Sequence, residues 1–191
     1  MLRKLSISAA VLVAVVAGIA SASLVTAGTA SEPLPGGRDE LPAGTMQTGA
    51  PVADPNGGAP WAVRIYDGDS SVRCIVAGRT DGEAFGPVDA AGRIHDTGAV
   101  ASGGCADQAD EPLQLALARF PDTAGTGARS VLFGVAGAKV ARVELVEAGA
   151  RRPVDLDALR TFAIVSAGLA KQGAAEIVIT MSDGSSQTYR L

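Results

Sequence analysis

The chain has 191 residues, of which 47% are hydrophobic, 4% are aromatic and 19% are charged, and its formal net charge is −4. This length suits one domain behind a leader and does not suit several domains. The acidic balance excludes proteins that bind nucleic acid or an anionic lipid surface through clustered positive charge.

The first thirty residues have the pattern of an export signal. Arg3 and Lys4 precede an uncharged, mostly apolar stretch, and small residues at Ala22 and Ala27 offer cleavage points. The same stretch is long enough for an uncleaved span, which needs about 20 apolar residues. We expect residues 1–30 to be a signal peptide or a single transmembrane anchor helix. The remainder would then be extracytoplasmic, either secreted or held at the cell membrane by that segment alone.

Residues 31–60 form the next compositional region. They contain six prolines and six glycines and no aliphatic periodicity. Such a segment cannot bury enough apolar surface to fold by itself. We expect a disordered linker here, with the folded domain spanning 61–191 and Trp61 in its core.

From Trp61 onward, apolar residues recur with a period of two. The predicted strands are 61–66, 72–76, 113–118, 130–135, 142–146, 161–165, 177–180 and 187–191. Turn signals lie between them at Asp67-Gly68-Asp69, Ala148-Gly149 and Asp183-Gly184. The one helical candidate, 155–169, is weakened by β-branched residues and Gly168. The pattern predicts an all-β, antiparallel β-sandwich of about eight to ten short strands.

This organisation resembles the immunoglobulin-like β-sandwiches common on bacterial surfaces. The resemblance covers 61–191 and concerns architecture alone. In antibody-type domains the core tryptophan lies between the two cysteines, whereas Trp61 precedes both Cys74 and Cys105. The resemblance implies a two-sheet sandwich and carries no function.

Cys74 and Cys105 are the only cysteines. An even pair in an exported chain predicts a disulfide. A Cys105–His95 catalytic pair is the alternative that the sequence leaves open, because His95 is the only histidine. Three cysteine and histidine side chains are too few for a structural zinc site, which takes four ligands.

Two acidic groups have some of the ligands of a calcium site. One is Asp67-Gly68-Asp69 with Asp81 or Glu83, and the other is Asp155 with Asp157. Neither has the full ligand pattern of a calcium loop, and Asp-Gly is also ordinary turn chemistry. We therefore expect no metal and no cofactor.

No catalytic constellation is visible in the sequence. We therefore expect a non-enzymatic interaction or structural module of the cell envelope, whose partner is an extracytoplasmic protein or envelope component and not nucleic acid. The alternative is an exported hydrolase with its site in the glycine-rich loops of 77–110, where His95, Asp96 and Cys105 all fall.

Overall fold

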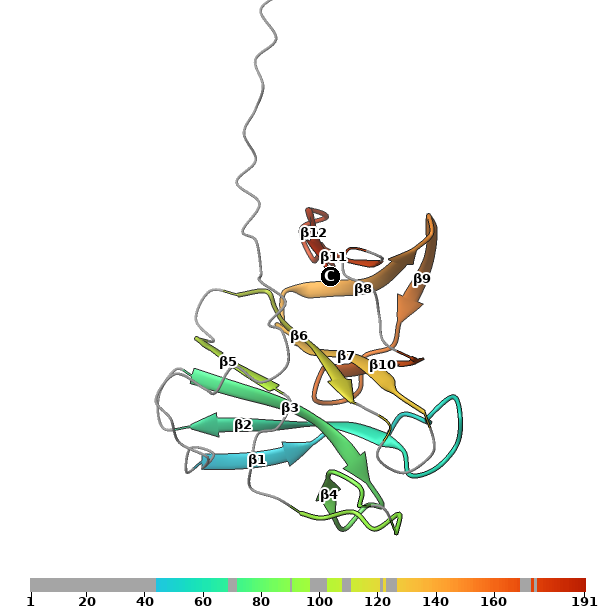
Figure 1. The fold of residues 1–191 in the computed structure, drawn as a ribbon. Coiled ribbons are helices and arrows are strands. Elements are labelled where there is room, and N and C mark those ends of the chain that lie inside the picture. The colour runs from blue at the N-terminus through green and yellow to red at the C-terminus, as the bar shows by residue number, and fades with distance from the viewer. Residues whose placement is uncertain are drawn as a thin grey trace, which may run out of the picture.

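The computed structural model describes residues 44–68, 72–89, 91–96, 103–107, 111–120, 122, 127–168, 173 and 175–191. These residues form twelve strands and no helix, so no membrane-crossing helix occurs in the described ranges (Figure 1). The strands are β1 (Gly44–Thr48), β2 (Trp61–Gly68), β3 (Val72–Thr80), β4 (Phe85–Gly86), β5 (Gly103–Asp107), β6 (Leu113–Phe120), β7 (Arg129–Ala136), β8 (Val140–Glu147), β9 (Ala150–Val154), β10 (Thr161–Ala167), β11 (Ala175–Met181) and β12 (Ser186–Arg190). The leader lies outside the described residues.

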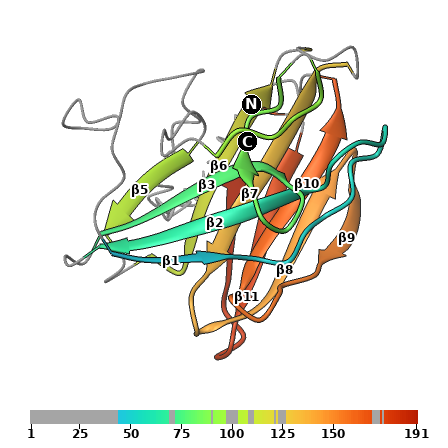
Figure 2. The same cartoon turned by 90° about the horizontal axis from the view of Figure 1, so that it is seen from below.

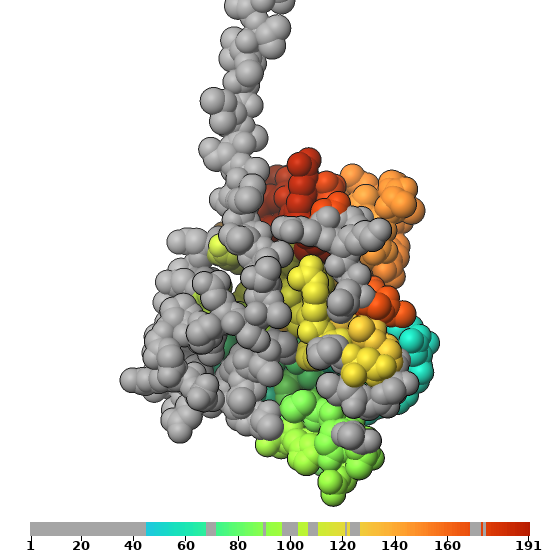
Figure 3. Space-filling view, viewed as in Figure 1, coloured from blue at the N-terminus to red at the C-terminus, as the bar shows by residue number. Residues whose placement is uncertain are grey.

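The strands form three antiparallel sheets. The N-terminal sheet has the order β1-β2-β3, and both β4 and β5 pair with β3. The central sheet is β10-β7-β6, and the C-terminal sheet is β12-β11-β8-β9. Figure 1 shows the central sheet between the other two, and Figure 2 shows β1, β2 and β3 crossing in front of it. In the space-filling view, yellow atoms of the central sheet lie between the green and the red layers (Figure 3).

Strand β7 is the centre of the molecule, and all eight of its residues are buried. Side chains alternate across a strand, so one set faces each neighbouring sheet. Val131, Phe133 and Val135 face the N-terminal sheet, and Leu132 and Ala136 face the C-terminal sheet. A strand covered on both faces has a near-continuous apolar sequence, which explains the unbroken run at 130–135.

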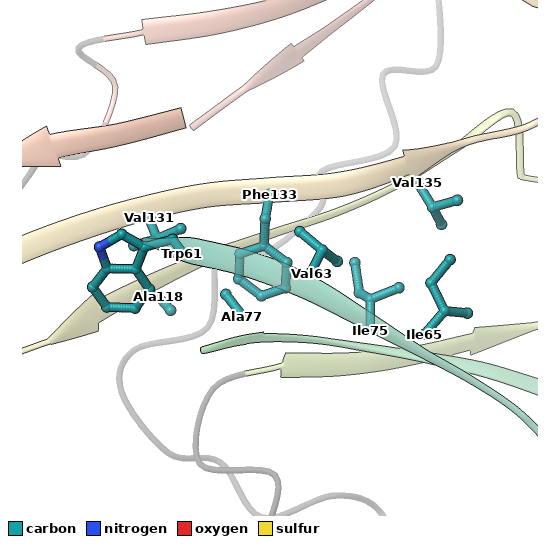
Figure 4. Close-up of a cluster of buried hydrophobic side chains, with 9 residues drawn as sticks. All are labelled: Trp61, Val63, Ile65, Ile75, Ala77, Ala118, Val131, Phe133 and Val135. Carbon is teal, nitrogen blue, oxygen red and sulfur yellow. The ribbon is translucent and has the colours of Figure 1, made fainter. Parts of the chain in front are cut away.

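Two apolar cores lie between the sheets. The first, between the N-terminal and central sheets, contains Trp61, Val63, Ile65, Ile75, Ala77, Ala118, Val131, Phe133 and Val135 (Figure 4). The second, between the central and C-terminal sheets, contains Leu113, Leu132, Ala136, Val140, Val143, Leu145, Phe162, Ile177 and Ile179. Burying each large aliphatic or aromatic side chain stabilises the fold by roughly 1.5–3 kcal/mol.

Gly134 allows the second core to close. A Cβ atom at this position would lie 2.5 Å from the carbonyl oxygen of Gln114 and 3.0 Å from the Phe162 ring. Neither the backbone of β6 nor the buried ring can move away cheaply, so only glycine fits in the middle of β7.

The structure confirms an all-β, antiparallel fold, and Trp61 is 3% exposed. The predicted hairpin of β2 and β3 forms with Trp61 opposite Arg79 and Tyr66 opposite Cys74. The immunoglobulin-like sandwich is not confirmed, because the described strands make three sheets where that architecture has two. Alternation predicts which residues are buried, but it does not assign a strand to a sheet.

The structure also differs from the expected linker at 31–60. Strand β1 lies in this range and pairs with β2 from Gly44 opposite Gly68 to Thr48 opposite Arg64. Backbone hydrogen bonds from Gly49 to Val63 and between Val52 and Trp61 continue the attachment. The described fold therefore includes residues from Gly44 onward. Composition did not reveal this, because β1 is held mainly through its backbone.

Candidate functional site

The loops of 77–110, where a hydrolase site was the alternative prediction, contain a small turn after β4. Its backbone is closed by hydrogen bonds from Asp89 N to Arg93 O and from His95 N to Pro87 O. Gly92 provides a positive φ of 81°, which glycine adopts without strain. The turn presents three polar side chains on the surface.

Asp89 organises these side chains. Its Oδ2 lies 2.8 Å from His95 Nε2 and 3.0 Å from both Nε and Nη2 of Arg93. Its Oδ1 accepts hydrogen bonds from the backbone N–H groups of Ala91 and Arg93, each at 2.9 Å. The hydrogen bond from His95, followed by the bonds from Arg93 and Ala91, holds the pKa of Asp89 well below its usual range. Asp89 is therefore ionised at any ordinary pH.

A carboxylate beside an imidazole is the orienting half of an acid–base arrangement, and catalysis also needs a nucleophile or a bound substrate next to the histidine. Among the described residues, no hydroxyl or thiol hydrogen-bonds to His95, whose side chain is 51% exposed. The described residues therefore place no nucleophile beside the pair.

Asp96 does not join His95. Its Oδ1 pairs with Arg64 Nη1 at 3.2 Å. Arg64 is buried in the N-terminal sheet, where its Nε donates to Thr48 Oγ1 at 3.1 Å and its guanidinium lies 4.1 Å from the centre of the Phe85 ring. Arg64 therefore attaches the end of the loop to β1, β2 and β4.

Cys105 is bonded to Cys74, as the sequence predicted. The two cysteines are directly opposite each other on β5 and β3. Cys74 is 1% exposed and belongs to an apolar cluster with Ala62, Tyr66, Val76 and Phe85. The Cys105–His95 alternative is therefore wrong, and the three residues of the predicted hydrolase site serve three separate contacts.

The acidic groups considered for calcium also have other contacts. Asp67 pairs with Arg73 at 2.7 Å, and Asp81 accepts two backbone N–H groups of its own turn. Asp157 accepts hydrogen bonds from Thr161 and Ala50. Asp69 lies outside the described residues. Within the described ranges, no three His, Cys, Asp or Glu side chains gather as a metal site would require.

A second polar cluster, centred on Asp54, was not found from the sequence. The Asp54 side chain is fully buried and lies 2.6 Å from Arg79 Nη2 and 3.0 Å from Arg129 Nε. Trp61 Nε1 donates to Asp54 Oδ2 at 2.9 Å, and the Asn56 N–H donates to Oδ1 at 2.8 Å. We call Asp54, Trp61, Arg79 and Arg129 the buried ion cluster.

The cluster joins three parts of the fold. Asp54 belongs to the segment between β1 and β2, Arg79 to the end of β3, and Arg129 to the start of β7. Arg79 packs 4.2 Å from the centre of the Trp61 ring and also donates to the carbonyl of Ala59. Arg129 Nη1 donates to the carbonyls of Gly127 and Ala128, whereas its Nη2 has no hydrogen-bond partner among the described residues.

Burial and partners act in opposite directions on the Asp54 charge. Burial alone raises the pKa of Asp54, but hydrogen bonds from Trp61, Asn56 and Arg129 and the charge of Arg79 outweigh it, so the pKa is lowered. Burial lowers the pKa of Arg79, and Asp54 opposes that shift. The carboxylate is thus kept ionised in the interior by its partners.

One sequence signal could have indicated this cluster. Arg129 precedes the run 130–135 and is in phase with Val131 and Phe133, so a strand there directs an arginine toward the core. A buried guanidinium needs an acidic partner. The sequence does not identify which aspartate it is, because Asp54 lies 75 positions away.

Comparisons with protein-family models, with curated proteins and with solved structures find no match to this chain.

Proposed function

We propose that this chain is an exported, envelope-associated β domain that acts as a non-enzymatic interaction or structural module. The observation that carries the proposal is the Cys74–Cys105 disulfide. Disulfides persist in oxidising compartments and are rare in the cytoplasm. A disulfide behind an N-terminal segment with the pattern of an export signal supports a site of action outside the cytoplasm.

The contacts of the loop residues support a non-enzymatic role. Cys105 is consumed by the disulfide, and Asp96 is paired with Arg64. Neither is available to work with His95, so the group of residues that favoured an exported hydrolase is divided among other contacts.

The test of export is the intact mass of the protein recovered separately from membranes and from the medium. A chain in the medium cut after Ala22 or Ala27 would identify a secreted domain, and the full-length chain in membranes would identify an anchored one. Each form is expected to lack two hydrogens relative to the reduced chain. Full-length protein in the cytoplasm with two free thiols would refute the proposal.

The His95–Asp89 pair keeps the hydrolase as a second candidate, since a carboxylate 2.8 Å from an imidazole can orient it for acid–base catalysis. The discriminating variant is His95→Ala, with Arg93→Ala as the matched control from the same turn. If the chain is a non-enzymatic module, both variants should rescue a strain that lacks the gene as well as the wild type does. If His95→Ala alone fails, while remaining folded and exported, the enzyme hypothesis replaces ours.

A further inference from the structure

Strand β10 is an edge of the central sheet. It pairs with β7 along its whole length, from Thr161 opposite Val135 to Ala167 opposite Arg129, with no shift of register. The order β10-β7-β6 leaves the other side of β10 without a neighbouring strand among the described residues. This edge is therefore regular and seven residues long.

Two backbone bonds establish which peptide groups of β10 point outward. Ala136 N donates to Arg160 O and Gly168 N donates to Ala128 O, so hydrogen-bonded pairs stand at both ends of the ladder. In an antiparallel pair these positions alternate with residues whose N–H and C=O point away. The inward residues are Phe162, Ile164 and Ser166, and the outward residues are Thr161, Ala163, Val165 and Ala167.

Thr161 differs from the other outward residues because its backbone N–H and carbonyl both form hydrogen bonds with Asp157. The Thr161 N–H donates to Asp157 Oδ1 at 2.8 Å, and its carbonyl accepts from Asp157 N at 3.1 Å. In the described ranges, no such partner meets the outward groups of Ala163, Val165 and Ala167. Six backbone groups are thus presented in a row.

The edge strands of the C-terminal sheet carry residues that disfavour pairing with another chain, and β10 does not. Strand β9 carries Arg151, Arg152 and Pro153, and β12 carries Arg190 among polar residues. Charged residues and proline on an edge prevent pairing with another chain. The β10 sequence, TFAIVSA, has neither charge nor proline and is rich in residues that favour strands.

We propose that β10 pairs antiparallel with β10 of a second copy of this chain, about a two-fold axis at Val165. This register places Val165 opposite its counterpart and Ala163 opposite Ala167, so all six outward backbone groups form hydrogen bonds. The two central sheets become one continuous sheet. The inference goes beyond the proposed function and does not depend on it.

Two observations favour a second copy as the occupant. A two-fold axis brings like residues together at its centre, and the uncharged β10 strand meets its own copy there without charge repulsion. In addition, Ala163 and Val165 are half-buried against the first core and Ile164 against the second. Both cores therefore reach this edge and would continue into the partner.

The decisive experiment measures the mass in solution of the full chain and of two proline variants. Val165→Pro removes an outward N–H without removing a bond to β7. Thr188→Pro is the matched control, because Met181 N bonds to Ser185 O and Leu191 N bonds to Ala175 O, which makes Thr188 an outward residue of edge strand β12. We expect twice the chain mass for the wild type and Thr188→Pro, and the single mass for Val165→Pro.

A charge-swap pair tests the register even if the proline variant does not fold. Val165→Lys places two lysines face to face at the axis, and Val165→Glu places two glutamates there. Each variant alone is expected to be a monomer, and an equimolar mixture is expected to regain the doubled mass. Any retained leader is common to all variants and cannot produce this difference.

Hydrogen exchange gives the residue-level result. In the dimer the amides of Ala163, Val165 and Ala167 should be protected, and protection should fall on dilution. The proposal is overturned if the wild type is monomeric at its solubility limit. It is also overturned if Val165→Pro stays dimeric, if the lysine and glutamate variants do not combine, or if these amides stay protected in the monomer.

Discussion

Asp54 and Asp89 each bind two basic side chains, but they do so in opposite surroundings. The Asp54 side chain is fully buried, and its arginine partners are 10% and 2% exposed. The partners of Asp89 are far more open, since the Arg93 side chain is 75% exposed and that of His95 is 51% exposed. An aspartate thus meets two basic side chains in the interior at one site and at the water-exposed surface at the other.

Burial decides how much a charged pair matters to the fold. Water solvates the groups around Asp89 whether or not they meet, so their attraction adds little. In the interior, losing one partner leaves the others without solvation. The buried ion cluster should therefore determine the stability of the whole domain, whereas the Asp89 cluster should determine only the shape of its own turn.

The largest expected effect separates the two aspartates directly. Asp54→Ala leaves Arg79 and Arg129 buried without their carboxylate, which should cost about 3–5 kcal/mol of the free energy of unfolding. The melting temperature should fall by roughly 2–4 °C for each kcal/mol. Asp89→Ala is the matched control and should lower the urea midpoint far less, because its partners are exposed to water. Equal losses of unfolding free energy in the two variants would show that burial of the aspartate makes no difference.

A smaller effect should follow from Trp61→Phe, which keeps an aromatic ring but removes the N–H that donates to Asp54. A hydrogen bond to a charged group contributes about 1.5–3 kcal/mol, and urea unfolding followed by circular dichroism can measure its loss. Phe120→Leu alters the ring contact with Trp61, 4.5 Å between centres, and keeps the bond. If Trp61→Phe lost no more unfolding free energy than Phe120→Leu, the packing of the Trp61 ring would matter more than its hydrogen bond to Asp54.

Acid should weaken the fold through Asp54 less than deletion does, because protonation removes the charge and keeps the side chain. The pKa of Asp54 is lowered in the folded state, so its contribution is complete above the unfolded value of about 3.9. It is lost as the pH falls below that value toward the folded pKa. Between pH 6 and pH 2, the free energy of unfolding should change less with pH for Asp54→Asn than for the wild type. If the pH dependence became smaller in Asp89→Asn and not in Asp54→Asn, the acid sensitivity would belong to Asp89 and the prediction would be wrong.

The smallest effect is local. Asp89→Ala removes the acceptor of the Ala91 and Arg93 amides. Hydrogen exchange at these two amides should become faster, while exchange in β7 stays unchanged. Faster exchange in β7 would mean that the turn supports the core after all.

The parts of the fold that could be predicted from the sequence are those whose signal is local. The β2–β3 hairpin follows from alternation around Asp67-Gly68, and the disulfide follows from having two cysteines. Strand β1 gave no signal, because Gly44–Thr48 contains one large apolar residue, Met46, which is itself 54% exposed. Its pairing depends on the backbone of β2, which is distant in sequence.

The buried ion cluster and the three-sheet arrangement depend on long-range contacts in the same way. Asp54 lies in a proline- and glycine-rich stretch where an aspartate is normally solvated, and only the folded chain brings Arg129 to it. His95 and Asp96 are adjacent in sequence, but consecutive residues on an extended segment point apart. His95 therefore pairs with Asp89 and Asp96 pairs with Arg64.

The Cys74–Cys105 bond also determines what a single proteolytic cut does to the chain. The exposed turn that carries Asp89 and His95 lies between the two cysteines in the sequence. A peptide bond cut in this turn leaves the two fragments covalently joined, with β1 to β4 on one and β5 to β12 on the other. A nicked chain would thus migrate as one species on a non-reducing gel and as two after reduction, and its sheets would keep their place around β7.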